Sequence, residues 1–165
     1  MDQVLAGKVA LITGSGRGIS QAIALAYAAH GPQVICSARS GDEIGNTADQ
    51  IREGSGKIIT IGSGMGHKGL ANNTAYCCSK AALSMLMRTL AQEVQKGQIS
   101  VSELIPGPVK TAITGHLHPH NDSAFSIDGE WIKEPADVVP LALFLATQPH
   151  IGPTAKSFSL MRRDN

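Results

Sequence analysis

The chain has 165 residues, of which 42% are hydrophobic and 4% aromatic, and its formal net charge is +1. This size and composition predict a single domain over residues 1–165, and the near-neutral charge gives no electrostatic footprint for nucleic acid. No apolar stretch is long enough to span a bilayer, and the first residues lack the apolar core of a signal peptide. Three cysteines, two of them adjacent, favour a reducing compartment over a disulfide framework. We therefore expect a cytoplasmic protein with no membrane or nucleic-acid partner.

The first predicted element is a strand over 8–13, which runs directly into a glycine-rich turn and a helix over 18–29. Glycines in such a turn allow a tight bend, and the amides and dipole at the start of the helix attract a phosphate. A glycine-rich connection that binds nothing is the alternative, but the strand–turn–helix context disfavours it. We therefore assign nucleotide binding to Gly14, Ser15, Gly16, Arg17, Gly18 and Ile19.

A second strand is predicted over 33–38, and Arg39 follows it. In a nucleotide-binding unit of this kind, the end of the second strand faces the adenosine ribose. An acidic residue there would bind the 2′-hydroxyl, whereas an arginine favours a 2′-phosphate through charge-assisted hydrogen bonds. NADP(H) is therefore favoured over NAD(H), although Asp42 and Glu43 are close enough in sequence to compete for the arginine.

Ser63 follows a predicted strand over 57–62, and a long helix is predicted over 74–95. Within that helix, Tyr76 and Lys80 are one turn apart and project from the same face. An ammonium beside a phenol favours the phenolate, which is the electrostatic arrangement that a carbonyl reductase needs. Because Ser63 stands at the end of its predicted strand, we expect its hydroxyl to meet the same substrate oxygen. For the isolated pair, the alternative is a surface helix with a solvated lysine.

The remaining predicted elements are a helix over 42–52, a strand over 99–105, a helix over 135–147 and a strand near 156–160. Alternating strands and helices predict a parallel sheet with helices on both faces. The segment over 112–133 is long and irregular, and it contains His116, His118 and His120. No acid or cysteine completes an obvious coordination set around these histidines, so we expect no metal.

Three motifs together resemble the short-chain dehydrogenase/reductase family, in particular its 3-oxoacyl-carrier-protein-reductase-like members. They are the turn Thr13-Gly14-x-x-x-Gly18-Ile19, the set Ser63, Tyr76 and Lys80, and the loop Pro106-Gly107-Pro-Val-Lys-Thr111. The resemblance implies a Rossmann-like doubly wound parallel sheet with helices on both faces. It implies that Tyr76 exchanges a proton with the substrate oxygen, that Lys80 holds the cofactor ribose beside Tyr76, and that Ser63 orients the substrate. It places Pro106, Gly107, Val109 and Thr111 near the nicotinamide, and it implies a homo-oligomer formed through the helix over 74–95.

The chain departs from this family between Arg39 and Ser63, where it has only 23 residues, enough for one helix and one strand. It is therefore shortened by about two strand–helix units, with an apparent internal deletion near residues 53–56. One of the absent strands would lie between the first strand and the Ser63 strand, and an absent helix would carry the family's catalytic asparagine. The remaining strands still permit one sheet ordered 2-1-5-6-7 in the family's numbering.

Two functions follow from these observations. The first is an NADP(H)-dependent oxidoreductase that interconverts a carbonyl and a secondary alcohol of a small-molecule substrate by hydride transfer, with Tyr76 as acid and base. The alternative is a catalytically silent, truncated homologue that acts as a nucleotide-binding or dimerisation module. Turnover discriminates between them, because only the first function predicts it. The substrate is not identified by the sequence.

Overall fold

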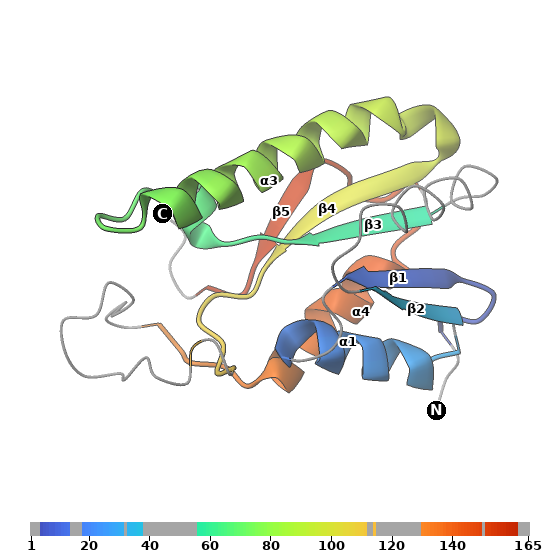
Figure 1. Ribbon diagram of the computed structural model, residues 1–165. Helices are drawn as coiled ribbons and strands as arrows, with labels where there is room; N and C mark the ends of the chain where they lie inside the picture. The colour runs from blue at the N-terminus through green and yellow to red at the C-terminus, as the bar shows by residue number, and fades with distance from the viewer. Residues whose placement is uncertain are drawn as a thin grey trace.

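The computed structural model describes residues 4–13, 18–31, 33–37, 56–111, 114, 130–149 and 151–161. Among the described elements, strands and helices alternate along the chain except that β3 follows β2 (Figure 1). In order, they are β1 (Val9–Thr13), α1 (Gly18–Ala29), β2 (Gln33–Ser37), β3 (Gly56–Ile61), the 3-10 turn η1 (Gly64–Gly66), α3 (Thr74–Glu93), η2 (Gln95–Gly97), β4 (Ile99–Ile105), η3 (Pro135–Val138), α4 (Val139–Thr147) and β5 (Lys156–Ser159). None of the helices in this part of the chain is long and apolar enough to cross a membrane.

The elements form three layers, with α3 on one side of the strands and α1 and α4 on the other (Figure 1). On the α3 side, Met87 and Ala91 pack against Val101 of β4. On the opposite side, Ile23 and Tyr27 of α1 belong to a larger buried cluster that also includes residues of α4. Residues four apart share a helix face, which explains why these two side chains of α1 point into the core together. The predicted parallel arrangement with helices on both faces is therefore confirmed.

Strand β4 is the centre of the larger sheet, and all seven of its residues are buried. It pairs in parallel with β3 along one edge, from Gly56 opposite Ile99 to Ile61 opposite Leu104. Along its other edge it pairs in parallel with β5. Parallel strands end at the same edge of a sheet, so the loops that follow β3 and β4 emerge side by side, where open α/β sheets bind their ligands.

The structure differs from the single sheet that the sequence permits. Strands β1 and β2 pair with each other in parallel, and no ladder joins β1 to β3 among the described residues. The physical reason is the shortening of the chain, since the strand expected between these two is one of the absent ones. Side chains connect the two sheets instead: Ile12 of β1 and Ile59 and Ile61 of β3 all pack against the same buried cluster.

The helix predicted over 135–147 is divided in the structure into η3 and α4. Pro140, at the start of α4, lacks a backbone N–H and is tolerated only in the first turn of an α-helix, so the regular helix begins beside it. The helix predicted over 74–95 ends at Glu93 and continues as η2. The helix predicted over 42–52, and most of the segment over 112–133, lie outside the described residues.

Candidate active site

Ser63 lies two residues after the end of β3 and takes the N-cap position of η1. Its backbone is extended, with φ −157° and ψ 145°, and its side chain is partly buried. The Oγ atom accepts a hydrogen bond from the amide of Met65 at 3.2 Å. Because the oxygen is the acceptor in this bond, the hydroxyl proton remains available to a substrate oxygen.

Tyr76 and Lys80 lie one turn apart near the start of α3, as predicted. The Lys80 Nζ atom is 5.8 Å from the centroid of the Tyr76 ring, and it donates a hydrogen bond to the carbonyl of Ile61 at 2.9 Å. Ile61 is the last residue of β3 and stands two positions before Ser63. The Tyr76 side chain is 41% exposed, so a substrate can reach it. The lysine therefore links the tyrosine to the strand that precedes the serine.

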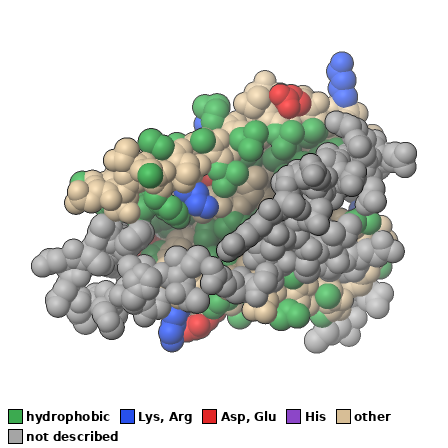
Figure 2. Space-filling view, in the orientation of Figure 1, with side chains coloured by type: hydrophobic (Ala, Val, Ile, Leu, Met, Phe, Trp, Pro, Cys, Tyr) green, Lys and Arg blue, Asp and Glu red, His purple; other side chains and the backbone are tan. Residues whose placement is uncertain are grey.

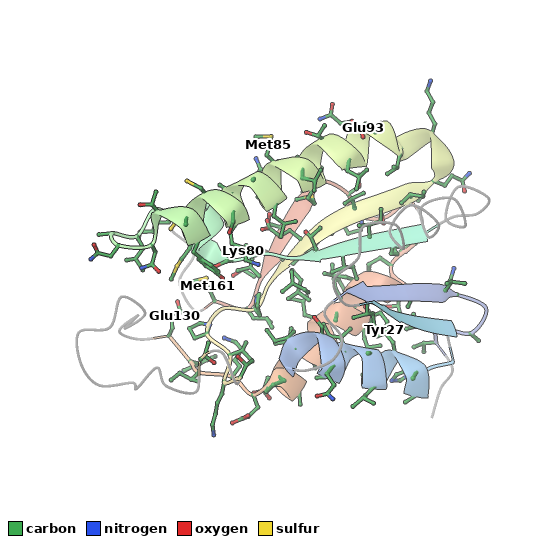
Figure 3. The ribbon with its side chains drawn as sticks, viewed as in Figure 1. Tyr27, Lys80, Met85, Glu93, Glu130 and Met161 are labelled. Carbon is green, nitrogen blue, oxygen red and sulfur yellow. The ribbon has the colours of Figure 1, made fainter. Side chains whose placement is uncertain are left out.

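The turn η1 packs directly against the backbone of α3. A Cβ atom at Gly66 would lie 2.8 Å from both the backbone carbon and the backbone oxygen of Lys80, so any side chain there would clash. This close approach holds Ser63, at the beginning of the turn, beside the helix of Tyr76 and Lys80. Figure 3 shows Lys80 at the end of the sheet from which the loops after β3 and β4 emerge, with Met161 nearby. The structure thus brings the three predicted catalytic residues into one region.

The two predicted cofactor segments meet at Gly18 and Thr111. Gly18 begins α1 with a φ of 64°, a left-handed conformation that favours glycine, and a Cβ atom there would lie 3.4 Å from Cγ2 of Thr111. The amide of Thr111 donates to the Thr114 hydroxyl at 2.7 Å, and that hydroxyl donates to the carbonyl of Val109 at 2.6 Å. Ile19 packs against the core behind this contact. One elongated dinucleotide would span both segments, and their contact fits such a ligand.

The loop after β4 is fastened to the segment around Lys133. Val109 and Lys133 form an isolated parallel bridge, and the amide of Lys110 donates to the carbonyl of Lys133 at 2.8 Å. A Cβ atom at Gly107 would lie 3.2 Å from Cγ of Met161 and 3.3 Å from Nζ of Lys133, so a larger residue would be crowded. The other predicted loop residues, Pro106 and Val109, are buried.

A small cavity of about 50 Å³ opens beside Ser63. The residues around it come from the turn after β3, the loop after β4 and the segment after β5, and they are Ser63, Gly64, Met65, Gly107, Pro108 and Met161. A cavity of this volume holds a few non-hydrogen atoms of a substrate. The serine hydroxyl is the only side-chain hydrogen-bonding group among these six residues, which suits a small polar group on a mainly apolar body.

Two sets of residues singled out in the sequence lie outside the described residues. They are the cofactor candidates Gly14, Ser15, Gly16, Arg17 and Arg39, and the histidines His116, His118 and His120. Their roles stay predictions. Within the described ranges there is no group of three or more His, Cys, Asp or Glu residues that could hold a metal ion.

A polar cluster behind Ser63 escaped the sequence analysis. Glu103 is fully buried in β4, and its Oε2 atom accepts hydrogen bonds from Oγ of Ser157 at 2.6 Å and from Oγ of Ser84 at 3.3 Å. The same oxygen is 2.9 Å from Nε2 of His67, which follows η1. The signal was present in the sequence, because an acidic residue in the middle of a buried strand must find hydrogen-bond partners.

Two other titratable groups are perturbed away from this site. Tyr27 is 6% exposed, and its hydroxyl donates to the carbonyl of Ala142 at 2.8 Å. Burial raises the pKa of Tyr27 and keeps the phenol neutral, so it ties α1 to α4 as a structural group. Partial burial, and secondarily the charge of Lys8, lowers the pKa of Lys57.

A layered parallel α/β fold, with a serine, a tyrosine and a lysine gathered at the carboxyl ends of its strands, defines a Rossmann-like protein. The family model described as short chain dehydrogenase matches residues 8–55 and 49–122. The chain belongs to the short chain dehydrogenase family.

Curated relatives agree with this assignment. The chain is 35% identical over 101 residues to carbonyl reductase family member 4 of Xenopus laevis, a match that covers 61% of this chain and 42% of the relative. It is 36% identical over 106 residues to 3-oxoacyl-[acyl-carrier-protein] reductase FabG of Chlamydia pneumoniae, covering 59% of this chain and 40% of the relative. The chain therefore matches less than half the length of these relatives.

Solved structures share the fold. One is named as an NAD(P)-dependent gluconate 5-dehydrogenase from Beutenbergia cavernae with bound NADP; it has a TM-score of 0.78 and 24% identity, over 96% of this chain and 97% of that chain. A short chain dehydrogenase from Mycobacterium paratuberculosis bound to NAD has a TM-score of 0.72 and 21% identity, over 94% and 96% of the two chains. At these identities the likeness concerns the fold alone, and it confirms the Rossmann-like architecture.

Proposed function

We propose that this chain is an NADP(H)-dependent oxidoreductase that interconverts a carbonyl and a secondary alcohol of a small molecule. The observation that carries the proposal is the packing of the Ser63 turn (residues 62–67, which include η1) against the helix of Tyr76 and Lys80. This packing brings a hydroxyl, a phenol and an ammonium into one region. Carbonyl chemistry is also supported by the names of two relatives, a carbonyl reductase and a 3-oxoacyl-[acyl-carrier-protein] reductase.

The proposed reaction divides the work among the three side chains. A bound nicotinamide cofactor supplies the hydride that reaches the carbonyl carbon. Tyr76 gives its phenolic proton to the carbonyl oxygen, and in the reverse direction it takes the proton back. Lys80, with Nζ 5.8 Å from the ring centroid, stabilises the phenolate that remains. Ser63 keeps its proton and donates a hydrogen bond from its hydroxyl to the same substrate oxygen, which fixes the position of that oxygen.

The described residues fit a dinucleotide cofactor, because the glycine turn and the loop after β4 touch at Gly18 and Thr111. In this proposal the start of α1 faces the pyrophosphate, Tyr76 and Lys80 face the ribose, and Thr111 faces the nicotinamide side. The preference for NADP(H) rests on Arg39 and its charge-assisted contact to a 2′-phosphate. Solved structures of similar fold contain NADP in one case and NAD in another, so the fold alone does not set the preference.

The chain's organisation and partners are also part of the proposal. A single shortened domain with an internal deletion near 53–56 is supported by the two-part match to the family model, whose segments meet at 49–55. A homo-oligomer formed through α3 is supported by Met85 and Leu86, which are 62% and 58% exposed, and Figure 2 shows hydrophobic side chains along this helix. Light scattering measures the oligomeric state directly. The cytoplasmic location stays a prediction based on cysteine usage.

The experiment that tests the function compares two tyrosine variants. The purified chain is titrated with NADPH and NADH while its melting temperature is followed, and turnover is then measured with a panel of ketones and alcohols. Tyr76→Phe should lower kcat by about 100-fold or more, with cofactor affinity nearly unchanged, because it removes the proton donor. Tyr27→Phe removes the same atom from a buried structural site, and it should keep kcat. Turnover preserved in Tyr76→Phe would exclude this mechanism, and cofactor binding without turnover in the wild type would favour the silent homologue.

The cofactor preference needs a separate variant. Arg39→Ala should weaken NADPH binding by about tenfold or more while leaving NADH binding nearly unchanged, because only NADPH carries the phosphate. Fluorescence of the reduced nucleotides measures both dissociation constants. If Arg39→Ala weakened the binding of NADPH and NADH equally, there would be no argument for a 2′-phosphate site at Arg39.

A further inference from the structure

The side chain of Glu103 packs directly behind the backbone of the Ser63 turn. A Cβ atom at Gly62 would lie 2.5 Å from Cδ and 2.6 Å from Cγ of Glu103, and closer still to Oε1. The buried glycine therefore makes the space that the carboxylate fills. Gly62 stands between Ile61, whose carbonyl accepts the hydrogen bond of Lys80, and Ser63. The carboxylate thus supports the short stretch of backbone on which both functional groups depend.

The other oxygen of Glu103 joins three elements around the site. Oε2 is 2.9 Å from Nε2 of His67 at the end of the turn, 3.3 Å from Oγ of Ser84 on α3, and 2.6 Å from Oγ of Ser157 on β5. Ser84 lies one helical turn beyond Lys80. In the described part of the chain, Oε1 accepts no hydrogen bond. One side chain therefore touches the beginning of the turn at Gly62, its end at His67, and the helix against which the turn packs.

Packing of the strand alone does not require an acid at this position. Burying a carboxyl group costs desolvation free energy, and buried polar networks can often be replaced by apolar residues without loss of stability. What the carboxyl group adds is directional bonding to His67 and Ser84. Such bonding restricts how the turn can shift along the helix, which an apolar contact does not.

We propose that Glu103 is a positioning residue, which fixes residues 62–67 relative to α3 and so holds Ser63 in register with Tyr76 and Lys80. The catalytic consequence rests on the proposed function, whereas the fixing of the turn does not. Misplacement of a reacting group by about 1 Å can cost as much as 100-fold in rate. Loosening this turn should therefore appear in kcat more than in KM or in cofactor affinity, because the substrate and the cofactor keep their other contacts.

The first test uses four variants, each compared with the wild type in kcat, KM and melting temperature. Glu103→Gln keeps the size of the side chain but changes its bonding, and His67→Phe removes the ring nitrogen. Both should lower kcat by about tenfold or more with KM within about threefold. His67→Gln, which returns an amide donor, should recover most of the loss. Val101→Ala, in the same buried strand but outside the network, should lower the melting temperature and keep kcat. Unchanged kcat in Glu103→Gln and His67→Phe would overturn the proposal.

A second test separates this inference from the proposed function. If the wild type shows no turnover on any ketone or alcohol, the proposed function fails, and amide hydrogen exchange then decides the positional claim. The amides of Gly66 and His67 donate to the carbonyls of Ser63 and Gly64 at 2.9 and 3.0 Å. In Glu103→Gln these amides should exchange at least about tenfold faster, while α4 stays unchanged. If the turn amides exchanged at the same rate in Glu103→Gln and the wild type, or if exchange rates rose uniformly across the molecule, the proposal would be overturned.

Discussion

Replacing Gly62 with alanine would place a methyl group inside the van der Waals envelope of the Glu103 side chain. The added Cβ would lie 2.5 Å from Cδ and 2.6 Å from Cγ, and real Cβ atoms do not approach other atoms so closely. Glu103 cannot turn toward solvent, because it is fully buried. The variant must therefore displace the carboxylate from His67, Ser84 and Ser157.

The cost has two parts, overpacking and lost hydrogen bonds. Forcing extra volume into a packed core costs about 1–3 kcal/mol, and loss of the carboxylate's hydrogen bonds adds a similar amount, so Gly62→Ala should lower the free energy of unfolding by about 2–6 kcal/mol. For a domain of this size each kcal/mol corresponds to about 2–4 °C, so the melting temperature should fall by about 4–24 °C. Urea melts followed by circular dichroism measure the free energy.

A matched control and a double-mutant cycle test whether the cost of Gly62→Ala comes from its contact with Glu103. Gly69→Ala adds the same methyl group where nothing lies within 4 Å, and it should be neutral or slightly stabilising. In a Glu103→Ala background the clash is gone, so Gly62→Ala should cost at least about 2 kcal/mol less than in the wild type. If Gly62→Ala costs the same in both backgrounds, or behaves like Gly69→Ala, the two residues are not coupled as described.

Two further predictions concern groups away from the site. Tyr27→Phe should lower the free energy of unfolding by about 1–2 kcal/mol, since it leaves the carbonyl of Ala142 without its hydroxyl donor; an unchanged urea midpoint would contradict the buried bond. The pKa of Lys57 is lowered in the folded chain from its ordinary value of 10.5. At pH values between these two pKa values the unfolded chain binds more protons than the folded chain, so stability should rise with pH in this range. Lys57→Met should lose this rise, which urea melts at several pH values would detect; parallel pH profiles for the two proteins would refute it.

Much of the fold could be predicted because the strands are marked by apolar runs that are recognisable from neighbouring residues alone. The predicted strands over 8–13, 57–62 and 99–105 agree with β1, β3 and β4 to within a residue at each end. Apolar runs bounded by glycine or polar residues carry this information directly. The division of the helix over 135–147 was harder, because the effect of Pro140 depends on where the first regular turn begins.

Long-range pairing could not be predicted in the same way. The sequence permits a ladder between the first strand and the strand before Ser63. No residue near either strand indicates whether the two pair directly when the strand between them is absent. In the structure they are joined through side chains instead. For the site, spacing was sufficient to place Tyr76 and Lys80 on one helix face. Glu103 was missed because its partners are 36, 19 and 54 residues away in the sequence, at His67, Ser84 and Ser157.

The central position of β4 has a consequence for the order in which the molecule assembles. Its two neighbours come from opposite directions in the sequence: Lys57 meets Ser100 across 43 residues, and Ser157 meets Glu103 across 54. Contacts this distant close large loops before any stabilisation is gained, which slows folding. Among the described strands β5 is the last to be synthesised, so a nascent chain can form the Ser63 turn early but can complete its polar support only after β5 has docked.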